Sequence, residues 1–103
     1  MSSEGATVSL AESAVADLEA IRHWYIEQQV PDIGERLVTE IFRRIEALER
    51  HPELGRIVPE FEQPFLRELI HPPFRIVYRC DPGRIRVVRV WRSERLLRLP
   101  EDP

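Results

Sequence analysis

The spacing of apolar residues along this chain changes once, from a helical to a strand pattern, and this change restricts the folds open to it. Between about residues 12 and 50, apolar side chains recur every three or four positions, as in amphipathic helices. Between about residues 65 and 91 they recur at alternate positions, as in strands with one buried face. A chain of 103 residues has room for one hydrophobic core. We therefore expect a single domain of the α+β class over residues 1–103.

The N-terminal half predicts a short strand followed by a helical hairpin. Residues 6–10 alternate weakly and are too few for a helix, so we expect a leading strand there. Helices are predicted from Glu12 to Gln29 and from Ile33 to Arg50. Val30-Pro31-Asp32 separates them, because proline lacks an N–H donor and moves the preceding residue out of the helical region. Such a short connection makes the two helices antiparallel neighbours.

The C-terminal half predicts three antiparallel strands, over residues 65–70, 74–80 and 85–91. Asp81-Pro82-Gly83-Arg84 predicts a tight turn between the last two, because proline fixes φ and glycine tolerates positive φ. Val87 and Val88 interrupt the alternation of the last strand, which indicates either a β-bulge or burial on both faces. The expected order is β-α-α-β-β-β, with the helical hairpin packed on the C-terminal antiparallel sheet.

Charge is divided unequally between the two halves of the chain. Residues 1–63 contain six Arg and 13 acidic residues, a net charge of −7, whereas residues 64–103 contain nine Arg and five acidic residues, a net charge of +4. All 15 basic residues are Arg. A basic half of this kind is typical of a protein with an anionic partner, such as a nucleic acid or an acidic peptide. A solvated sheet face accounts for the same pattern, and the charge count leaves both interpretations open.

Arginines on neighbouring strands are the main candidates for a binding site. In the middle strand, Phe74, Ile76 and Tyr78 are expected to face the core, which leaves Arg75 partly exposed on the other face. Four arginines are expected to converge into one positive surface suited to phosphate or carboxylate groups: Arg67, Arg75, Arg79 and Arg86. Acid–base catalysis has few candidates beside them, since Tyr78 is expected in the core.

The sequence lacks the motifs of a metal or nucleotide cofactor. It has no glycine-rich phosphate loop and no Cys/His cluster with metal-ligand spacing, so we expect no cofactor and no metal site. Cys80 lies in an apolar alternation and is predicted to be a structural core residue. One cysteine cannot form an internal disulfide, and no basic start precedes a long apolar run, so we expect a cytoplasmic location with no membrane-spanning segment.

Six short motifs, in this order and spacing, resemble the RelE/ParE superfamily of bacterial toxins. They cover nearly the whole chain: residues 16–21 (ADLEAI), 51–56 (HPELGR), 58–60 (VPE), 67–69 (REL), 74–79 (FRIVYR) and 85–90 (IRVVRV). The resemblance implies the toxin of a type II toxin–antitoxin pair, which inhibits growth, stabilises a plasmid or chromosome, and is neutralised by a ParD-like antitoxin whose C-terminal segment wraps the toxin.

Two activities occur in the superfamily, and the resemblance favours one of them. ParE-like members inhibit DNA gyrase by binding it, whereas RelE-like members cleave mRNA in the ribosome with basic sheet residues and a C-terminal Tyr or His. Residues 91–97 (WRSERLL) resemble the basic end of ParE proteins, although Arg92 stands where His is common, and a RelE-type tyrosine is absent. We therefore expect a gyrase inhibitor that is not an enzyme, with an mRNA endoribonuclease as the alternative.

The resemblance and the arginine pattern together assign the site residues. Residues expected to bind the target or the antitoxin are Arg67, Arg75, Arg79, Arg86, Trp91, Arg92 and Arg95. If the chain is a ribonuclease, the expected catalytic residues are Arg67, Arg75 and Arg92.

Overall fold

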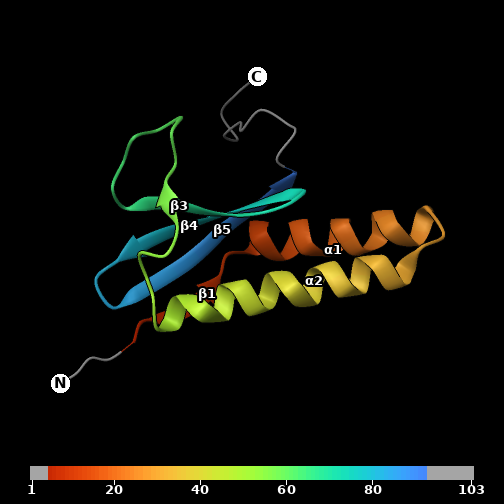
Figure 1. Ribbon diagram of the computed structural model, residues 1–103, viewed down its shortest axis with the longest axis horizontal. Helices are drawn as coiled ribbons and strands as arrows, with labels where there is room; N and C mark the ends of the chain where they lie inside the picture. The colour runs from red at the N-terminus through yellow and green to blue at the C-terminus, as the bar shows by residue number, and fades with distance from the viewer. Residues whose placement is uncertain (1–4, 93–103) are drawn as a thin grey trace.

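The computed structural model describes residues 5–92, which form a five-stranded mixed sheet with two antiparallel helices across one face (Figure 1). The elements are β1 (Thr7–Leu10), α1 (Glu12–Glu27), α2 (Pro31–Glu46), the short 3₁₀ helix η1 (Ala47–Glu49), β2 (Arg56–Ile57), β3 (Leu66–His71), β4 (Phe74–Asp81) and β5 (Arg84–Arg92). The strands lie in the order β1-β5-β4-β3-β2. The predicted α+β class and element order are confirmed.

The helical hairpin forms as the sequence predicts, but α2 begins at Pro31 and not at Ile33. Pro31 lies in the first turn of α2, where a missing N–H leaves no helical hydrogen bond unmade. Gly34 lets the helices approach closely, because a Cβ there would lie 2.8 Å from the Cβ of Tyr25. Arg22 and Glu35 join the same two helices by a 2.7 Å ion pair. None of the helices within residues 5–92 is both long and apolar enough to cross a membrane.

The sheet contains the three predicted antiparallel strands and two further pairings. β1 runs parallel to β5, and the two-residue β2 pairs with β3. β2 is too short to produce a period-two pattern, so the sequence did not indicate it. The register between β4 and β5 shifts at Val77/Tyr78 and leaves Val88 unpaired, which shows that the adjacent valines form a β-bulge.

The core lies between the helices and the sheet. Its buried apolar residues include Leu18, Val38, Ile41, Ile45, Leu48, Leu69, Phe74, Ile76, Tyr78, Ile85, Val87 and Val90. The Tyr78 hydroxyl donates a 2.9 Å hydrogen bond to the Pro52 carbonyl and accepts one of 2.9 Å from the Gly55 N–H. Burial raises the pKa of Tyr78, which keeps this hydroxyl protonated. Tyr78 therefore fastens the segment after η1 to the core.

Helix α1 completes the open edge of β5 beyond the end of β1. The Asp17 carboxylate accepts a 2.9 Å hydrogen bond from the Val90 N–H and two from the Arg89 guanidinium, at 2.7 and 3.0 Å. The Ser13 hydroxyl donates to the Val88 carbonyl at 2.6 Å. Backbone groups that a neighbouring strand would otherwise satisfy are thus bonded by α1 side chains.

The Asp17 contacts predict a measurable stability loss. Asp17→Ala leaves the Val90 N–H and the Arg89 guanidinium without their acceptor, so we expect the free energy of unfolding to fall by about 1–3 kcal/mol. Urea denaturation of both proteins measures the change. Glu19→Ala, at an exposed position of the same helix, is the matched control and is expected to change stability by less than about 0.5 kcal/mol. Equal effects of the two substitutions would refute this role of Asp17.

Candidate functional site

Most of the predicted site residues lie on strands whose registers define a surface opposite the helices, which we call the outer face. It carries the side chains of Thr7, Ser9, Arg56, Leu66, Glu68, Ile70, Arg75, Val77, Arg79, Asp81, Arg84, Arg86, Arg89 and Trp91. Its two parts differ. Glu68, Arg75 and Val77 are buried, whereas Arg79, Arg84 and Arg86 are exposed.

A chain of four alternating charges crosses the buried part of the outer face, with Glu68 and Arg75 buried at its centre and Arg56 and Glu60 exposed at its ends. Arg56 donates to one oxygen of Glu68 at 2.7 Å, and Arg75 donates to the other oxygen at 2.6 and 2.7 Å. Arg75 also makes a bidentate contact with Glu60, at 2.9 and 3.0 Å. Hydrogen bonds to Glu60 and Glu68 raise the pKa of Arg75, and those from Arg75 hold the pKa of Glu60 below its ordinary value of 4.5. The arrangement ties the segment after η1 to β3 and β4.

The predicted exposure of Arg75 is therefore wrong. Arg75 is only 7% exposed and Glu68 only 1%. The alternation of β4 correctly places Arg75 opposite Tyr78, but the segment that carries Glu60 covers this part of the outer face. The guanidinium group that was expected to meet a partner is used within the chain.

Arg67 does not join the other arginines either. It lies across from Tyr78 in the β3–β4 register, on the helix side of the sheet. Its guanidinium donates to the carbonyls of Gly55 at 3.0 Å and Pro64 at 3.2 Å, so it joins two points of the connection between η1 and β3, one before β2 and one just before β3. The expected convergence of four arginines is wrong for Arg67 and Arg75.

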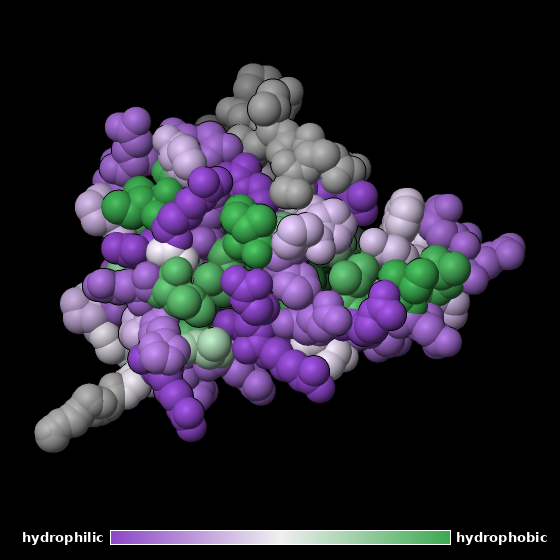
Figure 2. All heavy atoms as spheres, in the orientation of Figure 1, coloured by the Kyte–Doolittle hydropathy of each residue, from purple (hydrophilic) through white to green (hydrophobic). Residues whose placement is uncertain are grey.

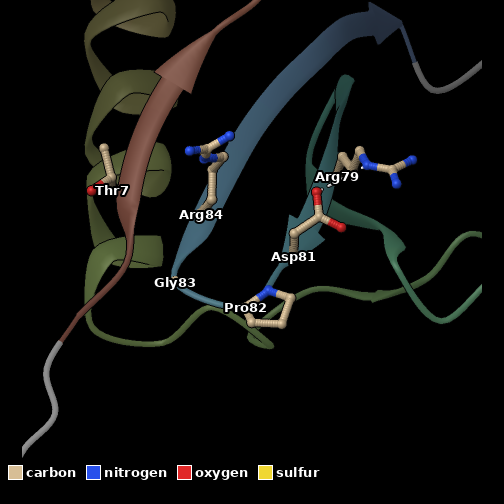
Figure 3. A pocket seen from close by; sticks show the side chains of 6 residues that line it. All are labelled: Thr7, Arg79, Asp81, Pro82, Gly83 and Arg84. Carbon is tan, nitrogen blue, oxygen red and sulfur yellow. Dashed lines mark hydrogen bonds and ion pairs between the residues drawn. The ribbon is translucent and has the colours of Figure 1, made fainter.

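Arg79 and Arg86 do lie side by side, directly opposite each other on β4 and β5. The Arg79 guanidinium donates to Asp81 at 3.0 Å and lies 4.5 Å from the ring centre of Phe65. A hollow beside it is lined by Thr7, Arg79, Asp81, Pro82, Gly83 and Arg84 (Figure 3). Arg84 and Arg86 are exposed, and their side chains form no hydrogen bond or ion pair within residues 5–92.

Two further sets of arginine–aromatic contacts lie along the C-terminal half of β5, with Arg89 and Trp91 on the outer face and Arg92 on the helix side of the sheet. The Arg89 guanidinium lies 4.4 Å from the ring centre of Trp91, and that of Arg92 lies 5.6 Å from Trp24 and 5.8 Å from Phe74. Trp24 was not among the predicted site residues, although its sequence position, a large aromatic residue beside the apolar stripe of a helix, could have indicated it. Arg95 lies outside the described residues.

Comparison with protein families matches residues 8–97 to the family described as the ParE toxin of the type II toxin–antitoxin system parDE. The chain belongs to the ParE toxin family. No curated protein matches it. Among solved structures, the chromosomal ParDE toxin–antitoxin system of P. aeruginosa has a chain with a TM-score of 0.73 and 26% sequence identity, over 87% of this chain and 98% of that one.

A second solved structure agrees in fold alone. The toxin–antitoxin complex RelBE2 of Mycobacterium tuberculosis has a chain with a TM-score of 0.65 and 18% identity, over 86% of this chain and 99% of that one.

The exposed part of the outer face of this ParE toxin offers groups that bind anions. The carboxylates of Glu60 and Glu68 are held by arginines, and the Tyr78 hydroxyl is buried with a raised pKa. The exposed arginines supply permanently charged, bidentate donors for phosphate or carboxylate. Within residues 5–92, no group of three or more His, Cys, Asp or Glu side chains could hold a metal ion.

Proposed function

We propose that this chain inhibits DNA gyrase by binding it and is neutralised by a cognate ParD-like antitoxin. The observation that carries the proposal is the match to the ParE toxin family over residues 8–97. The outer face supports it, because its exposed arginines can bind an anionic group on a partner. The nearby carboxylates of Glu60 and Glu68 are occupied by ion pairs with Arg56 and Arg75.

The antitoxin needs apolar surface to bind tightly, and the helical hairpin offers it. Ile26, Val30 and Ile33 are each more than one-third exposed near the connection between α1 and α2. Figure 2 shows apolar side chains gathered at this end of the hairpin, where it extends past the sheet. Apolar anchors supply most of the free energy in such interfaces, and an amphipathic antitoxin helix or strand fits them.

A pair of assays tests the activity. Purified toxin is added to gyrase with relaxed plasmid, and separately to a translating ribosome with a reporter mRNA. We expect loss of supercoiling and intact mRNA. Ribosome-dependent cleavage of the mRNA would overturn the assignment and establish the RelE-like alternative.

The predicted role of the C-terminal basic residues gives a second measurement. A chain ending at Arg92 keeps every described element but lacks Arg95 and the rest of residues 93–103. We expect it to lose gyrase inhibition by at least tenfold while it still co-elutes with the antitoxin in size-exclusion chromatography. Unchanged inhibition by the shortened toxin, with its thermal melting preserved, would show that residues 93–103 make no contact with the target.

A further inference from the structure

The three exposed arginines at the turn between β4 and β5 form a surface with uncompensated positive charge. We call this surface, formed by Arg79, Arg84 and Arg86, the basic end of the outer face. Asp81 is the one acidic side chain beside it in the strand registers, and it bonds Arg79. Asp81 also lies opposite Arg84 in the register, but the side chains of Arg84 and Arg86 form no ion pair within residues 5–92. Arg79 and Arg86 face each other directly, and like charges in that position destabilise a strand pair.

We propose that the basic end is a docking surface for the phosphate backbone of double-stranded DNA. Phosphate oxygens between the guanidinium groups would offset the repulsion between Arg79 and Arg86 and would occupy the unpaired donors of Arg84. The choice of DNA over other phosphate polymers rests on the proposed function, since gyrase holds duplex DNA during its reaction. The protein would then contact both the enzyme and its substrate.

The lining of the hollow favours a nucleic-acid backbone over an acidic peptide. Its side chains are charged or hydroxylic, apart from Pro82 (Figure 3). Protein partners draw most of their binding free energy from apolar anchors seated in pockets, which this surface does not provide. Phosphate backbones are bound through charge and hydrogen-bond donors alone, and Thr7 and Ser9 add hydroxyl groups beside Arg84 and Arg86 in the β1–β5 register.

The same surface favours duplex over single-stranded DNA. Proteins that bind single strands combine positive charge with exposed aromatic rings on which bases stack. The aromatic ring beside the basic end is Phe65, and the guanidinium of Arg79 lies over it at 4.5 Å. In Figure 3 the guanidinium groups of Arg79 and Arg84 point away from each other, which suits contacts to separate phosphates.

The test is the salt dependence of binding to a fluorescein-labelled 20-base-pair duplex, measured by fluorescence anisotropy with the full-length toxin alone. Each phosphate contact contributes about 0.9 to the slope of log K against log salt concentration. We expect Arg84→Ala/Arg86→Ala to reduce the slope by about 1.8 and to weaken binding roughly tenfold per arginine at low salt. The control, Arg36→Ala/Arg43→Ala, removes the same charge from exposed positions of α2 and is expected to keep the slope.

Four results would overturn the proposal. Two concern the duplex: no binding by the unmodified toxin at 25 mM salt, or an unchanged slope in the Arg84→Ala/Arg86→Ala variant. The other two are tighter binding of a single strand of equal length, or of poly-glutamate, than of the duplex. If the alanine variant fails to fold, Arg84→Gln/Arg86→Gln replaces it and is expected to reduce the slope by the same amount, because it removes both charges and keeps polar side chains of similar length. Gyrase is absent from this assay. If the toxin does not inhibit supercoiling by gyrase, but the Arg84/Arg86 variant shows the reduced slope, the proposed function is refuted and the DNA-binding surface is supported.

Discussion

Replacement of Arg75 by alanine is expected to lower the free energy of unfolding by about 3–5 kcal/mol, because it leaves the buried carboxylate of Glu68 without its main partner. It also releases Glu60 and the segment that Glu60 attaches to the sheet. Urea denaturation of the purified toxin measures the loss. Arg36→Ala, at an exposed position of α2, is the control and is expected to change stability by less than about 0.5 kcal/mol. A loss below about 1 kcal/mol for Arg75→Ala would contradict the buried network.

A paired replacement separates the structural role of Arg75 from any contact with a partner. Arg75→Met/Glu68→Leu exchanges a buried ion pair for apolar side chains, a change that is often neutral or stabilising. We expect it to recover most of the stability lost in Arg75→Ala. If growth inhibition returns with stability, Arg75 acts only in the fold. If stability returns without toxicity, Arg75 or Glu68 contacts the target.

The same network gives stability a dependence on acid pH. The pKa of Glu60 is held below 4.5 by the hydrogen bonds from Arg75. As pH falls, Glu60 is therefore protonated at a higher pH in the unfolded chain than in the folded chain. Its contribution is therefore fully present well above pH 4.5 and is lost as pH falls through the lowered folded pKa. We expect the contribution of Glu60 to this pH dependence to be absent in Arg75→Ala.

The elements of this fold follow from local patterns, and these were visible in the sequence. The spacing of apolar residues defined both helices and the three long strands, and Pro31 marked the boundary between the helices. The parallel pairing of β1 was not predictable in this way, since it joins residues about 77 positions apart without a pattern of its own. Periodicity identifies an element but not its neighbour.

Part of the candidate site was also open to prediction. A turn at Pro82-Gly83 sets the register of the hairpin, and that register places Arg79 opposite Arg86. The burial of Arg75 was not predictable from alternation, which gives the face of a strand but not what covers that face. Arg75 is covered by the segment that carries Glu60. This segment belongs to a connection with three prolines and no periodic pattern, so its position on the sheet is visible only in the folded chain.

Gly55 lies where the backbone of this connection comes into close contact with β3 and with the side chain of Tyr78 on β4. A Cβ at this position would lie 2.5 Å from the Glu68 carbonyl oxygen and 2.8 Å from Cε1 of Tyr78. The Gly55 N–H donates to the Tyr78 hydroxyl, and its carbonyl accepts from Arg67. Because both neighbours belong to the sheet and one is backbone, neither can move without disturbing the strand pairing.

Gly55→Ala is therefore expected to lower the free energy of unfolding by about 3 kcal/mol, at the upper end of what an added methyl group costs in a packed site. The control is Gly83→Ala, where the added Cβ meets nothing within 4 Å and the cost is the strain of a φ of 72°, about 1–2 kcal/mol. Urea denaturation of both variants separates steric conflict from backbone strain. If Gly55→Ala costs no more than Gly83→Ala, the connection shifts freely, and the attachment of Arg56 and Glu60 to the outer face is weaker than the hydrogen bonds indicate.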